Sequence, residues 1–288
     1  MTNYFIATKP FQFFNCVNLA VPGDENILII IPNFAYAKDF YNEILTKNYI
    51  WSKVYYIKNK SEIRNVITSL NPKDRVYVDN DLHNQVFKLG PLSKNGLYVY
   101  EEGLDIYRIN ITNVTKSKTK NFIIKLLNIL SLYNSNMGGH RKTKGLYTYN
   151  LDKYNAVHKN LKHKTLRFPN SFIGNYIRHK DYFDDIFYLS KLDLPKESRV
   201  AIYATDNNRE VDHLTFLNSL SKDNYDSLIF KPHPNVADLY PDSHYLSTII
   251  SEILILAILE NGCTIDFYHH GTSSEFYLNH KRLKFIKI

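Results

Sequence analysis

The sequence contains few cysteines and no long apolar run. Cys16 and Cys263 are the only two cysteines among 288 residues, and they lie far apart. Disulfides therefore do not hold this chain together, and a reducing cytosol is the expected compartment. No apolar run reaches the roughly 18–20 residues that cross a bilayer. Residues 1–10 also lack the basic-then-apolar pattern of a secretory signal, so we expect a cytoplasmic protein.

Several nucleotide-binding and catalytic motifs are absent. The sequence has no Gly-x-Gly-x-x-Gly fingerprint, no Gly-x-x-x-x-Gly-Lys-Ser/Thr loop and no Gly-x-Ser-x-Gly elbow. A dinucleotide fold with its usual signature, a P-loop and the usual α/β-hydrolase nucleophile are thereby excluded. With 44% apolar and 22% charged residues, the composition is globular rather than disordered, collagen-like or coiled-coil.

Acidic residues are scarce in the middle of the chain. Residues 106–180 contain 15 Lys/Arg and one acid, Asp152, which gives this section a net charge of +14 within a total of +8. Such a basic section favours an anionic partner, which would be a nucleotide, a nucleic acid, a phosphorylated glycan or an anionic membrane.

One apolar stretch lies inside this basic section. Residues 121–133 read NFIIKLLNILSLY, with lysines and arginines on both sides. As a helix it would either lie on the inner face of the cytoplasmic membrane, with basic residues at the headgroups, or pack as a core or interface helix.

Short apolar runs alternate with helical patterns along the chain. We predict strands at 4–7, 27–31, 53–57, 75–78, 96–100, 200–204, 227–230 and 263–268, and helices at 11–19, 39–45, 62–70, 249–259 and 274–278. This alternation predicts crossover connections and parallel sheets. The length suits two α/β domains, which we place at 1–155 and 156–288. Residues 113–120 and 135–145 are polar and basic, and we expect loops there.

Chemically useful residues follow several predicted strands, where open parallel sheets bind ligands. Glu101, Glu102 and Gly103 follow the fifth strand. Adjacent carboxylates repel each other, so one of them is a candidate general base, whereas the alternative is a solvated turn. Asp206, after the 200–204 strand, is another candidate base.

Two strand ends in the second half have the chemistry to hold a phosphate. In Lys231-Pro232-His233-Pro234, two prolines restrain one histidine, which can protonate a leaving phosphate oxygen. Gly271-Thr272-Ser273-Ser274 offers three hydroxyls at a predicted helix start, which suits phosphate binding. The alternatives are a solvated histidine and an ordinary helix cap.

Two patterns carry potential metal ligands. Asp79-Asn80-Asp81 has the Asp-x-Asp spacing that many metal-dependent glycosyltransferases use, and His269-His270 offers two imidazoles. Such triplets are common by chance, and no further Cys or His stands at zinc-site spacing from the histidine pair. We therefore predict no metal site.

In this order, the strand ends resemble motifs of the bacterial sialyltransferases. Those enzymes carry an Asp/Glu-Asp/Glu-Gly motif, a His-Pro motif and a Ser-Ser/Thr motif, and the corresponding residues here are Glu101-Glu102-Gly103, His233-Pro234 and Ser273-Ser274. The segment 8–15, TKPFQFFN, is similar to the Thr-Pro-x-Gln stretch that begins the lipooligosaccharide sialyltransferases, with Lys9 as an extra residue. The motifs span nearly the whole chain, and the sequence between them does not match.

The resemblance implies a GT-B architecture, in which two Rossmann-like domains face each other across a cleft. It implies CMP-sialic acid as donor and a galactose- or N-acetylgalactosamine-ended acceptor, such as a glycan or glycolipid of lipooligosaccharide or capsule. The N-terminal domain would hold the acceptor and the base, and the C-terminal domain the donor. The implied general base is Glu102, followed by Glu101, and the general acid is His233. The implied donor-binding residues are Lys231, Pro232, Gly271, Thr272, Ser273 and Ser274, and those on the acceptor side are Thr8, Gln12 and Asn15.

CMP carries a single phosphate, so no pyrophosphate charge requires Mg²⁺, and the expected reaction is an inverting, metal-independent displacement without a cofactor. Two alternatives remain open. One is a glycosyltransferase with another nucleotide-sugar donor, and the other is a nucleic-acid-binding protein that uses residues 106–180. Under the first interpretation no nucleic acid is bound, and the sequence leaves the oligomeric state open.

Overall fold

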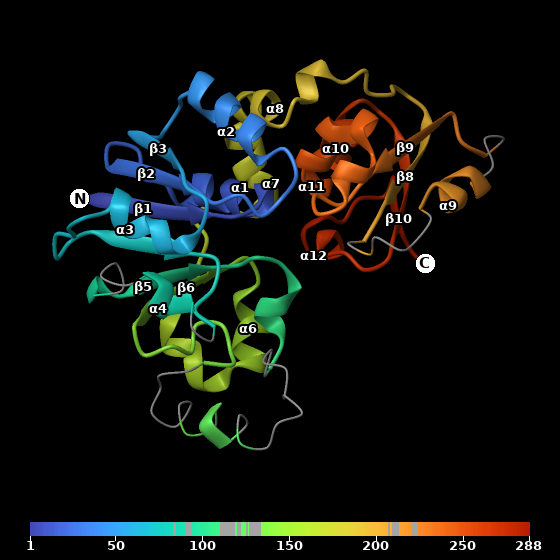
Figure 1. Ribbon diagram of the computed structural model, residues 1–288. Helices are drawn as coiled ribbons and strands as arrows, with labels where there is room; N and C mark the ends of the chain where they lie inside the picture. The colour runs from blue at the N-terminus through green and yellow to red at the C-terminus, as the bar shows by residue number, and fades with distance from the viewer. Residues whose placement is uncertain are drawn as a thin grey trace. The chain divides into compact units, whose positions relative to one another are not determined.

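The chain consists of two compact units. The computed structural model describes residues 1–82, 85–89, 94–109, 119, 122–124, 126, 134–206, 208, 213–220 and 224–288. Unit 1 comprises Met1–Pro32 and Asn48–Ser171, and unit 2 comprises Asn33–Lys47 and Phe172–Ile288. Each unit has its own parallel sheet (Figure 1).

This division differs from the predicted boundary after residue 155. Strand β7 (Thr165–Arg167) hydrogen-bonds in parallel to β6 (Thr143–Thr148), so the first sheet continues beyond residue 155. Residues 33–47 belong to unit 2 because helix α2 (Ala37–Thr46) packs on helix α8 (Lys180–Ile186). An ion pair of 2.8 Å between Lys47 and Asp185 adds to this packing.

Unit 1 contains a seven-stranded parallel sheet in the order β3-β2-β1-β4-β5-β6-β7. Its other strands are β1 (Thr2–Ala7), β2 (Glu25–Ile30), β3 (Lys53–Tyr56), β4 (Arg75–Val78) and β5 (Leu97–Tyr100). Its helices are α1 (Pro10–Leu19), α3 (Ile63–Val66), α4 (Gln85–Leu89) and α6 (Leu151–Val157), with 3₁₀ turns at Lys60–Glu62, Leu104–Tyr107 and Lys159–Lys164.

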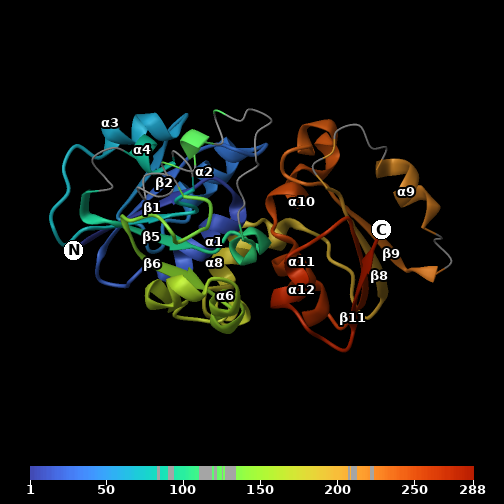
Figure 2. The same ribbon diagram turned by 90° about the horizontal axis from the view of Figure 1, so that it is seen from below.

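Alternate residues of these strands pack on opposite faces of the sheet, as strand geometry requires. On one face, Ile6 and Val76 join a core cluster with Ile63 of α3 and Val86 of α4. On the other face, Phe5 stacks on Tyr77 at 4.6 Å. Helices α3 and α4 lie on one side of the strands and α1 on the other (Figure 2).

Unit 2 contains a four-stranded parallel sheet in the order β11-β10-β8-β9. The strands are β8 (Arg199–Ala204), β9 (Ser227–Lys231), β10 (Thr264–His269) and β11 (Leu283–Lys287). The remaining helices are α7 (Phe172–Arg178), α9 (His213–Ser219), α10 (His244–Thr248), α11 (Ser251–Glu260) and α12 (Ser274–Tyr277), with 3₁₀ turns at Leu189–Lys191, Ala237–Leu239 and Pro241–Ser243. Helix α11 is buried almost all round, which explains its nearly uninterrupted apolar sequence.

All eight predicted strands are confirmed to within two residues at each end. Three strands were missed: β6 begins inside the stretch 135–145 that we expected to be a loop, β7 has three residues, and β11 contains two lysines. The predicted helix at 62–70 is shorter, because only Ile63–Val66 is α-helical. The expected loop at 113–120 and helix at 121–133 fall mostly outside the described residues. Within the part that is described, no helix is long and apolar enough to cross a membrane.

Candidate functional site

A buried polar stripe on helix α1 organises the strand ends of unit 1. Gln12, Asn15 and Asn18 are spaced three residues apart, so they share one face of the helix, and they are 0%, 0% and 3% exposed. Gln12 accepts a hydrogen bond from the backbone of Thr8 (2.6 Å) and donates to Asp79 (3.5 Å). Asn15 donates to the carbonyl of Glu101 (2.7 Å). The helix thus ties together the segments that follow β1, β4 and β5. All three predicted acceptor-side residues, Thr8, Gln12 and Asn15, lie on this helix or directly before it.

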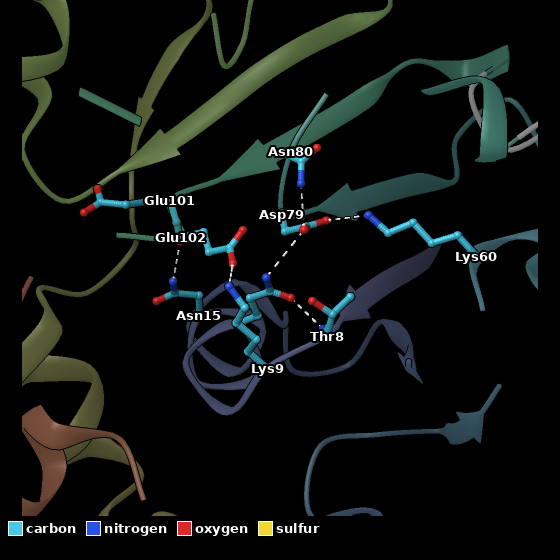
Figure 3. A network of polar contacts seen from close by, with 9 residues as sticks. Thr8, Lys9, Asn15, Lys60, Asp79, Asn80, Glu101 and Glu102 are labelled. Atoms are coloured by element: carbon cyan, nitrogen blue, oxygen red, sulfur yellow. Dashed lines mark hydrogen bonds and ion pairs between the residues drawn. The ribbon is translucent and has the colours of Figure 1, made fainter. Parts of the chain in front are cut away.

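The two adjacent glutamates point in opposite directions (Figure 3). Glu101 is fully buried, and its Oε2 accepts hydrogen bonds from Tyr107 Oη (2.8 Å), Thr148 Oγ1 (2.7 Å) and the Tyr149 N–H (2.9 Å). Burial, followed by the charge of Glu101, raises the pKa of Tyr107, so this phenol remains a donor. Glu101 is therefore a structural anchor for the segment after β6.

Glu102 is the accessible carboxylate. Its side chain is 17% exposed, and Oε1 accepts a hydrogen bond of 2.5 Å from Lys9 Nζ. Burial, and then the negative charge of Asp79, raise the pKa of Glu102, while Lys9 acts in the opposite direction. Gly103, with φ of 107°, adopts a left-handed conformation that disfavours side chains, and it turns the chain directly after the two acids.

The carboxylates of the Asp79-Asn80-Asp81 triplet have separate partners. Asp79 pairs with Lys60 (3.0 Å) and accepts a hydrogen bond from Asn80 (2.8 Å). Asp81 is fully buried and accepts bonds from Thr143 Oγ1 and from the backbone of Gly138 and His140. The two aspartates of the triplet therefore serve as structural hydrogen-bond acceptors for different segments of the chain.

In unit 2, the carboxyl ends of β9 and β10 are connected through Glu252 of α11. Ser274 Oγ donates to Glu252 Oε1 (2.9 Å), and Ser273 Oγ lies 3.5 Å from the same oxygen. Burial lowers the pKa of Lys231 to about 8, although Glu252 opposes that change. Burial likewise raises the pKa of Glu252, so both charges are held in a region of low polarity. Glu252 was missed by the sequence analysis, because a single acid in an apolar helix gives no signal.

His233 is oriented by its own loop. Its backbone N–H donates to Thr205 Oγ1 (2.8 Å), and its ring Nδ1 accepts from the N–H of Asn235 (3.1 Å). In the neutral imidazole the proton then resides on Nε2. Pro232 is buried and Pro234 is partly buried, so the histidine is held between two restrained residues.

The second loop of predicted donor-side residues follows β10. Gly271 is exposed with φ of 145°, Thr272 and Ser273 are partly exposed, and Ser274 is fully buried. Thr272 Oγ1 accepts a hydrogen bond from the Ser274 backbone (3.1 Å). Because β8 lies between β9 and β10, this loop and Lys231–Pro234 flank the end of β8, where Thr205 and Asp206 stand. The structure thus groups the predicted donor-side residues within unit 2 and the predicted acceptor-side residues within unit 1.

Comparisons of the sequence find no match, either among models of protein families or among curated proteins. Comparisons of the structure do. The wall teichoic acid polymerase TagF is similar with a TM-score of 0.53 at 13% identity, over 96% of this chain and 66% of that one. This chain therefore spans about two thirds of the TagF chain.

Two further solved structures are similar with TM-scores under 0.5. One is an α/β-galactoside α-2,3-sialyltransferase from Photobacterium phosphoreum (TM-score 0.49, 12% identity, 96% of this chain and 88% of that one). The other is a UDP-GlcNAc 2-epimerase from Neisseria meningitidis (TM-score 0.47, 12% identity, 94% and 78%).

At these identities the similarity concerns the fold alone. The α/β class with two Rossmann-like units of GT-B type, as predicted, is confirmed by the two parallel sheets and by the structural similarity. The predicted cleft, the chemistry and the roles of individual residues stay predictions.

Proposed function

We propose that this chain is an inverting, metal-independent sialyltransferase, which moves sialic acid from CMP-sialic acid to a galactose- or N-acetylgalactosamine-ended bacterial surface glycan. One observation carries the proposal: each group of motif residues is brought together at the carboxyl ends of a parallel sheet. Thr8 and Glu101 hydrogen-bond to helix α1, at Gln12 and Asn15, and Glu102 hydrogen-bonds to Lys9, which directly precedes that helix. Such edges are where open α/β sheets bind ligands.

Glu102 is the proposed general base. It is more accessible than Glu101, which is buried and accepts three internal hydrogen bonds. A raised pKa makes its carboxylate a stronger base towards an acceptor hydroxyl. Lys9 holds the carboxylate in place at 2.5 Å, and its positive charge opposes the rise in the pKa of Glu102.

Unit 2 supplies the proposed acid and phosphate-binding groups. His233 carries its proton on Nε2, because Nδ1 accepts the Asn235 N–H. Thr272 and Ser273 present partly exposed hydroxyls for the CMP phosphate, and Lys231 contributes positive charge below pH about 8.

The reaction is a single displacement. The acceptor oxygen attacks the anomeric carbon of sialic acid and forms the new glycosidic bond, while the bond from that carbon to the CMP phosphate oxygen breaks. Glu102 takes the proton of the acceptor hydroxyl, and His233 in its imidazolium form gives the Nε2 proton to the departing phosphate and is left as the neutral imidazole. One attack on one face inverts the anomeric configuration.

The test is an assay of the purified protein with CMP-sialic acid and a β-galactoside in the presence of EDTA. We expect transfer by the wild type, and a loss of about 10²–10⁴-fold in kcat for Glu102→Gln and for His233→Ala. The matched controls are Glu197→Gln and His163→Ala, whose side chains are exposed and lie outside both groups. Full activity of His233→Ala would remove it as the acid, and no transfer by the wild type would overturn the proposal.

The second candidate is a glycosyltransferase with another nucleotide-bound donor. It is favoured by the structural similarity to a wall teichoic acid polymerase, which has a TM-score of 0.53. A thermal-shift panel with CMP, CDP, UDP, GDP and ADP separates the two candidates. Stabilisation by CMP supports the sialyltransferase, whereas stabilisation by UDP or GDP without CMP supports the second candidate.

A further inference from the structure

Three potential metal ligands meet at the carboxyl end of the sheet in unit 2. Asp206 follows β8, His213 begins α9, and His270 follows β10. Among the residues that the structure describes, one ligand atom from each of these three side chains lies within 4.8 Å of the other two. The proposed reaction uses neither histidine, so this cluster calls for a separate explanation.

The spacing of two of the groups suits a tetrahedral ion. His213 Nε2 and Asp206 Oδ1 are 3.5 Å apart. Metal–ligand bonds of about 2.0–2.2 Å in tetrahedral zinc sites place neighbouring ligand atoms about 3.3–3.6 Å apart. These two atoms therefore already have the separation that an ion between them requires.

Tyr203 supports both imidazoles from behind. Its hydroxyl lies 2.7 Å from His213 Nδ1 and 2.9 Å from His270 Nε2. Histidines that bind metals nearly always engage their second ring nitrogen in such a hydrogen bond, which fixes the tautomer and the ring orientation. For His213, the bond to Tyr203 on Nδ1 leaves Nε2 facing Asp206 at 3.5 Å and the carbonyl oxygen of Asn208 at 3.3 Å.

The burial of the cluster is graded. His213 is 1% exposed and Tyr203 is 0% exposed, whereas the Asp206 side chain is 36% exposed. Two buried or partly buried imidazoles are therefore preorganised, and the carboxylate gives the site an opening towards solvent. A three-ligand set with an open fourth position for water is common for zinc.

We propose that Asp206, His213 and His270 bind one divalent transition-metal ion of the zinc type. Two imidazole nitrogens and one carboxylate oxygen favour this class over Mg²⁺ or Ca²⁺, which prefer oxygen ligands. The ion would join the ends of β8 and β10 to the start of α9 and so stabilise unit 2. It stands apart from the proposed transfer reaction, in which no step passes through it.

The experiment uses the full chain, freed of metal by dialysis against a chelator. Zn²⁺ binding is measured by calorimetry, and Co²⁺ is added as a spectroscopic probe of the coordination geometry. We expect one tight Zn²⁺ per chain and the intense visible bands of tetrahedral Co²⁺. We also expect a rise in Tm of about 5–10 °C when free Zn²⁺ exceeds Kd by about 100-fold.

Four variants test the assignment. Asp206→Asn and His270→Gln remove ligands that are only partly buried, and each should weaken Zn²⁺ binding by at least about 100-fold. Tyr203→Phe keeps all three ligands and should weaken it by about 10–100-fold. His163→Ala, an exposed histidine in unit 1, is the control and should bind Zn²⁺ as the wild type does.

Circular dichroism confirms that each variant is folded before its affinity is compared. Unchanged Zn²⁺ affinity in folded His270→Gln, or a Co²⁺ spectrum typical of six-coordinate ions, would overturn the proposal. The cluster would then be a hydrogen-bonded chain of polar groups without an ion. None of these measurements depends on sugar transfer, so the metal site and the proposed function can fail independently.

Discussion

Replacing each of the two adjacent glutamates separates a structural role from a chemical one. Glu101→Ala removes the acceptor of three buried hydrogen bonds, which come from Tyr107, Thr148 and the Tyr149 backbone. Glu102→Ala removes one partner of an ion pair whose side chains are 17% and 40% exposed. We therefore expect the first variant to lose stability and the second to lose activity.

The expected magnitudes follow from the contacts. Hydrogen bonds to a charged group contribute about 1.5–3 kcal/mol each. Tyr107 Oη and Thr148 Oγ1 lie 2.9 Å apart, so in the variant one hydroxyl can donate to the other and part of that loss is recovered. With the cavity included, we expect Glu101→Ala to lower the free energy of unfolding of unit 1 by about 3–5 kcal/mol. The Lys9–Glu102 ion pair is partly exposed, and we expect its loss in Glu102→Ala to cost about 1 kcal/mol.

The assay is urea unfolding followed by tryptophan fluorescence. Trp51 is the only tryptophan of the chain, is 3% exposed and lies in unit 1, with its ring 5.5 Å from that of Phe5. Its emission therefore reports on the unit that contains both glutamates. With a slope of about 2 kcal/mol/M, Glu101→Ala should lower the urea midpoint by about 1.5–2.5 M.

The reasoning is refuted if both variants unfold at the same urea concentration. It is also refuted if Glu102→Ala loses as much stability as Glu101→Ala. Glu101→Gln is an informative intermediate, because its amide oxygen can still accept bonds from the same donors. It should recover a substantial part of the loss if hydrogen bonding, rather than charge, is the main contribution.

The other predictions concern two ionisable groups and one buried hydrogen bond. Burial and the charge of Asp79 raise the pKa of Glu102, so the midpoint of the acidic limb of the kcat/KM profile should lie above the usual carboxyl value of 4.5. Asp79→Asn should move this midpoint to lower pH. A midpoint that does not move would show that Asp79 does not raise the pKa. The pKa of Lys231 falls from 10.5 to about 8, so between these values the unfolded chain binds more protons than the folded one. Over this pH range, the free energy of unfolding of the wild type should therefore rise by about 3 kcal/mol relative to that of Lys231→Met. Urea unfolding at several pH values measures both. If the difference between the two proteins does not change with pH, the lysine does not have the lowered pKa. Ser274→Ala loses the 2.9 Å hydrogen bond to Glu252, so calorimetry should show that unit 2 is destabilised by about 1–2 kcal/mol. An unchanged Tm would show that this hydrogen bond does not stabilise the unit.

Much of the fold was predictable because buried parallel strands have continuous apolar sequences. The run of apolar residues in β2 and the alternation of strands with helices indicated two parallel sheets. The missed strands lack this signal, since β6 contains Lys144 and Gly145, and β11 lies at a sheet edge with two lysines. Their pairing partners, not their composition, make them strands.

The candidate site was predictable in part for the same reason. Residues that directly follow parallel strands must gather at one edge, so Thr8, Glu101 and Glu102 all hydrogen-bond to helix α1 or to Lys9 directly before it. Asn18, Tyr149 and Glu252 were missed, because each acts through a partner more than 20 residues away in the sequence. No local pattern encodes such contacts.

The sequence by itself determined which residues stand at the strand ends, because apolar periodicity defines the strands and the chain order then places their neighbours. The side chains of Glu101 and Glu102, just after β5, point in opposite directions (Figure 3). Only the tertiary structure decided which of the two is buried, since that depends on the donors that β6 and the turn after β5 bring to it. The same holds for Asp206, His213 and His270, which meet because β8 and β10 are neighbours in a sheet and not because of their spacing along the chain.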